Sequence, residues 1–223
     1  MMNPPKSLEV VIVDDHPVMR RGLEAILLQH GGFKIAGQAD GESAALEVIS
    51  KTSADCALVD LSLREGSGLD LVKKLKQNFP QLPVVVVSMH EESLYAERAL
   101  RAGAKGYVTK EDAADHVVEA IQTVLRGGIY VSAPLSQKIM GRLFSSPASE
   151  SSTGIESLTD RELQIFEFFG EGKDVNEIAQ ILQLSSRTVE THRYNIINKL
   201  NLKKSSEMLQ RAIHWVQVEN RKV

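Results

Sequence analysis

Short apolar runs alternate with amphipathic segments through the N-terminal half of the chain. Runs such as VVVV at residues 84–87 are continuous, which is typical of strands buried on both faces of a parallel sheet. We expect strands at residues 8–13, 33–39, 56–59, 82–87 and 105–109. Apolar residues at helical spacing predict helices at residues 18–29, 42–50, 69–78, 93–101 and 113–126. This alternation predicts an α/β fold, a doubly wound parallel five-stranded sheet with strand order 2-1-3-4-5.

Beyond residue 126 the pattern becomes entirely helical. Residues 136–144 predict one short helix, and the Ser-rich residues 145–154 predict a polar linker. Four helices are expected after the linker, and capping boxes that begin at Thr159 and Asp174 open two of them. The expected parts of the chain are an α/β domain at residues 7–128, a linker with a possible short helix at 129–154, and an all-α four-helix domain at 155–220.

The composition is that of an ordinary globular protein, with 43% hydrophobic and 25% charged residues among 223. No apolar run approaches the ~20 residues that span a bilayer, and the first residues lack the order of a secretory signal. Cys56 is the only cysteine, so an intrachain disulfide is excluded and a cytoplasmic location is expected. The six histidines do not cluster at metal-ligand spacings, which argues against a zinc site.

Charge is distributed unevenly along a chain whose net charge is −3. From residue 186 to the end there are eight basic and three acidic residues, whereas residues 150–185 hold two basic and eight acidic ones. A basic end beside an acidic stretch indicates a small surface that binds a polyanion. A solvated helical surface would give the same distribution.

Three carboxylates follow strands that are neighbours in the expected sheet. Asp14 and Asp15 come directly after the first strand, and Asp60 comes after the third. Because parallel strands end at one edge of the sheet, these side chains should converge there. Crowded carboxylates repel each other unless a cation lies among them, and oxygen ligands suit Mg²⁺, which recruits a phosphoryl group.

A hydroxyl and an ammonium group complete the expected site. Ser88 ends the fourth strand and Lys110 ends the fifth. Both side chains can bind phosphoryl oxygens, by hydrogen bond and by charge. Together with the three carboxylates they predict a phosphotransfer site.

The N-terminal half resembles the receiver domains of two-component response regulators of the NarL/FixJ subfamily. The stretches VIVDDHPVMRRGL, ALVDLSL, VVVVSMH and AGAKGYVTK carry this resemblance, which spans residues 8–126. It implies that a sensor histidine kinase donates a phosphoryl group to Asp60 from a phosphohistidine. Further implied roles are Mg²⁺ binding by Asp14 (through water), Asp15, Asp60 and the Ser62 carbonyl, and phosphoryl binding or switching by Ser88, Tyr107 and Lys110.

One helix of the C-terminal domain has two different faces. Val189, Ile196 and Leu200 share an apolar face, and a long polar face opposite it is rich in donors and acceptors suited to a major groove. An ordinary amphipathic surface helix has the same pattern. The candidate DNA-binding residues are Arg187, Thr188, Glu190, Thr191, His192, Tyr194, Asn198 and Lys199.

The sequence LTDRELQIFEFFGEGKDVNEIAQILQLSSRTVETHRYNIINKLNL resembles the LuxR-type helix-turn-helix domain of the same subfamily. The combined resemblance implies a transcription factor that binds double-stranded DNA as a homodimer, with no membrane association. Phosphorylation would promote dimerisation or release of the DNA-binding domain.

Three other functions fit parts of the pattern. A phosphatase of the haloacid dehalogenase type needs a second carboxylate two residues after its nucleophile, where this chain has Ser62, so we do not expect an enzyme. A flavodoxin is disfavoured because the acidic turn after the first strand repels phosphate. The remaining alternative is a DNA-binding regulator that ignores phosphorylation and uses its receiver for protein contacts.

Overall fold

The computed structural model describes residues 7–63, 67–89, 92–144 and 154–220. Nearly all of the expected linker, residues 145–153, lies outside them. The chain forms two compact units, Met1–Arg142 and Leu143–Val223. No helix among the described residues is both long and apolar enough to cross a membrane.

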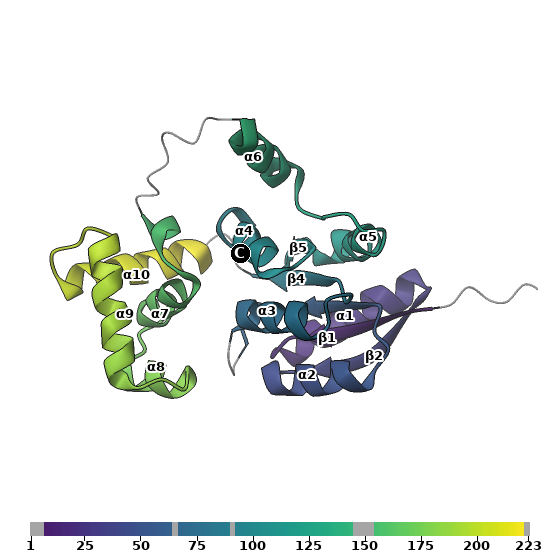
Figure 1. Ribbon diagram of the computed structural model, residues 1–223, viewed down its shortest axis with the longest axis horizontal. Coiled ribbons are helices and arrows are strands. Elements are labelled where there is room, and N and C mark those ends of the chain that lie inside the picture. Colours follow the sequence, from purple (N-terminus) through teal and green to yellow (C-terminus); the bar gives the residue numbers. More distant parts are fainter. Residues whose placement is uncertain (1–6, 64–66, 90–91, 145–153, 221–223) are drawn as a thin grey trace, which may run out of the picture. The chain divides into compact units, whose positions relative to one another are not determined.

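In the described part of the first unit, five parallel strands form one sheet in the order β2-β1-β3-β4-β5, which confirms the predicted fold class (Figure 1). The strands are β1 (Leu8–Val13), β2 (Phe33–Ala39), β3 (Cys56–Val59), β4 (Val84–Ser88) and β5 (Gly106–Thr109). The helices that accompany them are α1 (Pro17–His30), α2 (Glu42–Lys51), α3 (Gly68–Asn78), α4 (Glu92–Ala102) and α5 (Ala113–Leu125). Helix α1 packs beside α5, and α3 lies between α2 and α4.

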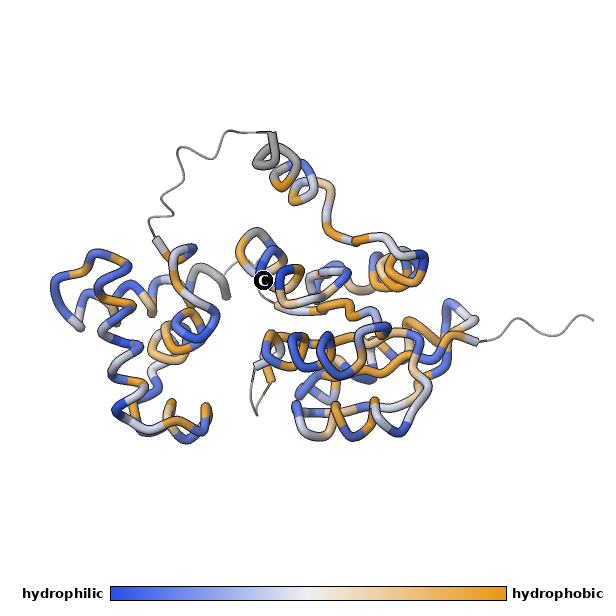
Figure 2. Tube along the Cα trace, in the orientation of Figure 1, coloured by the Kyte–Doolittle hydropathy of each residue, from blue (hydrophilic) through white to orange (hydrophobic). Residues whose placement is uncertain are grey.

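The inner strands are apolar on both faces because helices cover both. Every residue of β3 is buried, and so is every residue of β4. The strands are accordingly among the most hydrophobic parts of the trace (Figure 2). On one face, Leu23 and Leu27 of α1 and Ile121 of α5 join the core. Their burial holds the carboxyl ends of the strands in fixed positions.

The fourth strand differs from its predicted bounds. It begins at Val84 instead of residue 82, because Pro83 has no N–H to donate to a ladder. The carbonyl of Pro83 nevertheless accepts the N–H of Ala57 at 3.0 Å. At its other end the strand includes Ser88, so this side chain is held by the sheet itself.

The segment after α5 pairs with the edge of the sheet, which the sequence did not predict. Tyr130 forms a parallel bridge to Gly106 of β5. The N–H of Tyr107 donates to the Tyr130 carbonyl, and the N–H of Tyr130 donates to the Lys105 carbonyl, both at 2.9 Å. Helix α6 (Ala133–Phe144) follows and starts three residues before the expected 136.

The second unit is helical, as predicted. A short 3₁₀ turn, η1 (Ile155–Ser157), precedes α7 (Asp160–Gly170), α8 (Val175–Ile181), α9 (Ser186–Lys199) and α10 (Ser205–Asn220). Both predicted capping boxes are present, at Thr159 and Asp174, and Ser185 caps α9 by accepting the N–H of Thr188. Helix α7 packs against both α9 and α10, and α8 packs against α9.

Candidate functional sites

The ends of β1 and β3 bring two aspartates together. Val13 and Val59 are register partners, so Asp14 and Asp60 leave adjacent strands at the same level. The N–H of Asp60 donates to the Val13 carbonyl at 2.8 Å, which fixes this alignment. Asp14 and Asp60 are each 1% exposed. We call the pocket that they form with Asp15 the acidic pocket.

Lys110 lies between the two aspartates. Its Nζ is 2.7 Å from Asp14 Oδ2 and 2.7 Å from Asp60 Oδ2, and its side chain is only 4% exposed. Its backbone N–H donates to the carbonyl of the fully buried Ser88 at 2.8 Å. Four residues predicted from four separate strand ends therefore converge in this pocket.

The electrostatics of the pocket favour a further cation. Burial raises the pKa of Asp60 to about 6, although the Lys110 ammonium acts against this rise. Burial lowers the pKa of Lys110, but Asp60 and Asp14 outweigh it, so the net shift is upward. Buried Asp60 Oδ1 has no hydrogen-bond partner among the described residues. Three carboxylates with one ammonium leave an excess of negative charge, which suits a divalent cation.

The connection from β1 to α1 adds two residues that were not predicted from the sequence. Asp14 Oδ1 accepts the backbone N–H of His16 at 2.7 Å, and the Arg20 guanidinium donates to the Asp14 carbonyl. His16 Nδ1 lies 2.6 Å from Asp15 Oδ1. The spacing of histidines gave no sign of this residue, because its neighbours in the pocket are carboxylates. Its position directly after Asp14-Asp15 was the available signal.

The two remaining receiver candidates differ in burial. Ser62, whose carbonyl the resemblance assigned to Mg²⁺, is an exposed residue two positions beyond Asp60. Tyr107 in β5 is only 1% exposed.

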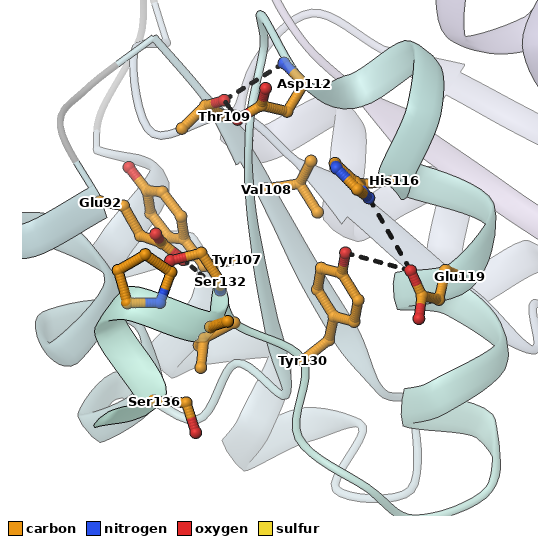
Figure 3. Close-up of a pocket in the computed structure, with 13 residues that line it drawn as sticks. Glu92, Tyr107, Val108, Thr109, Asp112, His116, Glu119, Tyr130, Ser132 and Ser136 are labelled. Carbon is orange, nitrogen blue, oxygen red and sulfur yellow. Dashed lines mark hydrogen bonds and ion pairs between the residues drawn. The ribbon is translucent and has the colours of Figure 1, made fainter. Parts of the chain in front are cut away.

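Tyr107 also lines a cavity of about 580 Å³ (Figure 3). The walls come from β5, α5, the start of α4 and the segment after α5. Glu92 Oε1 accepts the N–H of Ser132 at 2.7 Å, and the Tyr130 hydroxyl donates to Glu119 at 3.4 Å. The segment after α5 is thus bonded to β5, α4 and α5.

Helix α9 has the two faces expected from its sequence. Val189 and Ile196 are completely buried, and Leu200 just after the helix is 5% exposed. The candidates Arg187, Glu190, Thr191, Tyr194, Asn198 and Lys199 are exposed, whereas Thr188 and His192 are half-buried. Tyr194 is 65% exposed, although it is a large aromatic.

Several of the α9 candidates have partners within the unit. Glu190 pairs with Arg193 at 2.9 Å, and Thr191 Oγ1 donates to the Arg187 carbonyl at 3.0 Å. Lys199 Nζ lies 2.7 Å from Glu162 Oε2, and the Glu162 side chain is 5% exposed.

The partner of Lys199 belongs to the first capping box. Glu162 also accepts the N–H of Thr159 at 2.8 Å. Burial raises the pKa of Glu162, but the hydrogen bonds from Lys199 and Thr159 outweigh it, so the net pKa is lowered. From the sequence, Glu162 was expected only as part of the capping box that begins at Thr159, and its ion pair with Lys199 was not expected.

Both halves of the chain match described families. Residues 10–122 match the response regulator receiver domain, and residues 156–212 match the bacterial regulatory proteins of the luxR family. The chain belongs to the response regulator family: it is a two-component response regulator and transcription regulator, with a receiver followed by a LuxR-type DNA-binding domain.

Relatives of known name match along almost the whole chain. Response regulator UvrY of Escherichia coli K12 is 32% identical over 206 residues, covering 92% of this chain and 94% of its own. Response regulator GacA of Pseudomonas aeruginosa is 32% identical over 212 residues, covering 95% and 98%.

Solved structures show the same fold. The RcsB response regulator of Salmonella typhimurium superposes with a TM-score of 0.73 at 23% identity, covering 94% of this chain and 98% of its own. RcsB bound to the promoter P1flhDC in the presence of the phosphomimetic BeF₃⁻ superposes with a TM-score of 0.70 at 25% identity, covering 92% and 98%.

Proposed function

We propose that Asp60 is the phosphoacceptor of this response regulator. A carboxylate oxygen of Asp60 attacks the phosphorus of a phosphohistidine on a sensor histidine kinase. The P–N bond breaks, and the imidazole of the kinase leaves with its electron pair. Lys110 and Ser88 bind the transferred phosphoryl oxygens. The acceptor is modified once by each transfer and is not a turnover catalyst, so we do not assign an enzymatic activity to the chain.

Mg²⁺ is the proposed cofactor of this transfer. Asp15, Asp60 and the Ser62 carbonyl would hold the ion, and Asp14 would act through water. The ion would supply charge neutralisation at the reacting oxygens. The donor set fits, because oxygen ligands are what Mg²⁺ prefers and buried Asp60 Oδ1 has no partner among the described residues.

The observation that carries this proposal is the bridge that Lys110 forms between Asp14 and Asp60. Burying the Lys110 side chain to 96% costs the free energy of removing its charge from water. Such a position is expected where the charge serves the function of the protein. A structural ion pair would need one carboxylate. Two carboxylates and a buried hydroxyl on the neighbouring strand end instead supply the groups that a phosphoryl group and a metal ion would bind.

Intact mass spectrometry tests the assignment. Incubation with acetyl phosphate and Mg²⁺ should add one phosphoryl mass, which hydroxylamine removes because an acyl phosphate is labile to it. Asp60→Ala should abolish the added mass. Asp70→Ala, on the surface of α3, is the matched control and should label normally. Undiminished labelling of Asp60→Ala would exclude the assignment, and absence of labelling in the parent chain would favour the phosphorylation-independent regulator.

We propose that α9 reads DNA in the major groove. Its exposed polar face supports this assignment, and RcsB, the fold relative, has been solved on promoter DNA. The contacts would come from Arg187, Thr188, Glu190, Thr191, His192, Tyr194, Asn198 and Lys199. A homodimer should bind two half-sites about one helical turn apart. If two domains bind together, a change of half a helical turn in the spacing of the half-sites should abolish binding in a gel-shift assay.

We propose the functional boundaries 7–128 for the receiver, 129–154 for the linker and 155–220 for the DNA-binding domain. The family matches at residues 10–122 and 156–212 support them. The cytoplasm is the proposed location, because the kinase domain and the DNA that such a regulator serves are both there.

The proposed signal path runs from Asp60 to the segment after α5. Ser88 and Tyr107 lie on β4 and β5, and α4 packs against β5. The N–H of Tyr107 is bonded to Tyr130, and Glu92 at the start of α4 is bonded to Ser132. A shift of β5 or α4 would therefore change how the segment leading to the DNA-binding domain is held.

Sedimentation and DNA binding distinguish two outcomes of that signal. If phosphorylation promotes dimerisation, the phosphorylated chain should sediment as a dimer, and a fragment of residues 155–223 should bind DNA no better than the unphosphorylated chain. If phosphorylation releases a blocked domain, the fragment should bind more tightly. If phosphorylation changes neither the oligomeric state nor the DNA affinity, the proposed signal path from Asp60 to the segment after α5 is excluded.

A further inference from the structure

His16 is a member of the acidic pocket that phosphotransfer does not use. It follows Asp15 at the start of α1, and its side chain is 63% exposed. Its Nδ1 lies 2.6 Å from Asp15 Oδ1 and 3.4 Å from Asp14 Oδ1. The imidazole nitrogen therefore faces the carboxylates, while much of the ring is open to solvent and free to adjust.

The four side chains have the arrangement of a metal site. One donor atom each from Asp14, Asp15, His16 and Asp60 lies within 4.8 Å of the others. Ligands at about 2.1 Å from an ion are about 3–4 Å apart, so a small movement of the exposed His16 is enough to close the site. Buried Asp60 Oδ1, which has no hydrogen-bond partner among the described residues, independently indicates a ligand here.

The nitrogen donor changes which ions the site prefers. Mg²⁺ binds oxygen ligands and keeps several waters, so an imidazole adds little to its affinity. First-row transition metals bind imidazole well, and their affinity for such sites rises from Mn²⁺ towards Ni²⁺ and Cu²⁺. An imidazole added to these carboxylates should therefore raise the affinity for transition metals more than the affinity for Mg²⁺.

We propose that His16 makes the acidic pocket a mixed nitrogen–oxygen site that binds transition-metal dications such as Ni²⁺ more tightly than Mg²⁺. This proposal rests on the proposed phosphotransfer function, because the same carboxylates would hold the Mg²⁺ of that reaction. The two ions then compete for one pocket, and His16 decides the ratio of their affinities.

Calorimetric titration of the full chain with Ni²⁺ and with Mg²⁺ tests the proposal. The variant is His16→Asn, which does not endanger folding: His16 is the N-cap of α1 and makes no capping bond, and Asn is a favourable N-cap. The matched control is His30→Asn, an exposed histidine at the other end of the same helix. The ratio of Ni²⁺ to Mg²⁺ affinity should fall about tenfold or more in His16→Asn and stay unchanged in His30→Asn.

Two results would overturn the proposal. One is an unchanged affinity ratio in His16→Asn. The other is a tight Ni²⁺ site that survives in Asp60→Asn, since His16 would then bind metal outside the pocket. Labelling of the parent chain by acetyl phosphate, measured in parallel with Mg²⁺, keeps the two proposals distinguishable. If labelling proceeds and the ratio does not move, only the metal selectivity is wrong. If the ratio falls and labelling is absent, only the phosphotransfer is wrong.

Discussion

Asp14, Asp60 and Lys110 are almost completely buried at the end of the sheet, whereas Tyr194 and its neighbours on α9 are open to solvent. In the acidic pocket Lys110 is paired with Asp14 and Asp60, so ion pairs within the protein hold these groups in place. On the exposed face of α9 the groups depend on a partner that is another molecule. Mutations in the first site should therefore change stability and protonation, and mutations in the second should mainly change binding.

Replacement of Lys110 by Met should have the largest effect on stability. It leaves Asp14 and Asp60 buried without their ammonium, and breaking a buried pair in this way costs about 3–5 kcal/mol. Urea unfolding followed by circular dichroism, in EDTA at pH 7.5, measures the loss in the receiver transition. Lys105→Met, at an exposed position just before β5, is the control and should change stability by less than about 0.5 kcal/mol. Equal effects of the two variants would mean that Lys110 does not hold the pocket together.

Asp60→Asn should stabilise the receiver, and the gain should depend on pH. Because the pKa of Asp60 is about 6 in the folded chain, above its usual 3.8, its protonated form favours folding. That contribution is complete below the usual pKa and is lost as pH rises through 6. It amounts to about 3 kcal/mol in total, about half of it between pH 5 and 7.5. Asn does not titrate, so the unfolding free energy of Asp60→Asn relative to the parent should rise over this range in EDTA.

Saturating Mg²⁺ is the internal control for this pH effect. The ion should stabilise the parent chain at pH 7.5 more than it stabilises Asp60→Asn, because it neutralises the carboxylate that the variant lacks. A difference between the two chains that is the same at pH 5 and at pH 7.5 would contradict the raised pKa.

The acidic pocket was accessible from the sequence because topology determines it. Apolar runs locate the strands, and the order 2-1-3-4-5 of a doubly wound sheet then makes the first and third strands neighbours. The ends of these strands must meet, so Asp14, Asp60, Ser88 and Lys110 were all found before the structure was known. The contacts of these atoms were not accessible. Nothing in the spacing predicts that Lys110 bridges two carboxylates, since that depends on the path of a flexible side chain.

Contacts between helices were harder to foresee in the second unit. The capping box at Thr159 assigned Glu162 correctly to the start of α7, because a cap is a local feature. Its ion pair with Lys199, 37 residues further along, depends on how α7 packs on α9. In the first unit, the pairing of Tyr130 with β5 was not predicted either, because a single residue beside a sheet edge leaves no periodic pattern in the sequence.

Replacement of Tyr194 by Ala should change which DNA sequence the protein prefers. Tyr194 is 65% exposed, so the change costs little stability, and a true base contact is worth about 1–3 kcal/mol at one position. A binding assay across a library of half-sites should show the loss at one base pair. The control variant Gln217→Ala, on the exposed surface of α10, should leave the affinity for every half-site unchanged. A uniform loss for Tyr194→Ala across the library would exclude base readout.

The smallest expected effect separates two roles of Lys199. If Lys199 contacts a phosphate, Lys199→Ala should weaken binding to all DNA sequences equally and reduce the salt dependence of binding by about one unit of slope. As the partner of Glu162, it should also stabilise the packing of α9 on α7. Because the Lys199 side chain is 36% exposed, we expect only about 1 kcal/mol from this pair.

Glu162→Gln isolates the second role, since its amide oxygen can still accept the Thr159 N–H while the charge that holds Lys199 is gone. Trp215, the only tryptophan, lies in α10 and reports unfolding of this unit by its fluorescence. Glu162→Gln should therefore lose about 1 kcal/mol of stability and keep the parent salt slope, because Lys199 remains available to phosphate. Lys199→Ala should lose the same stability and should also reduce the salt slope by about one unit. If Lys199→Ala matches Glu162→Gln in stability and in salt slope, Lys199 supports α9 from within and does not contact DNA.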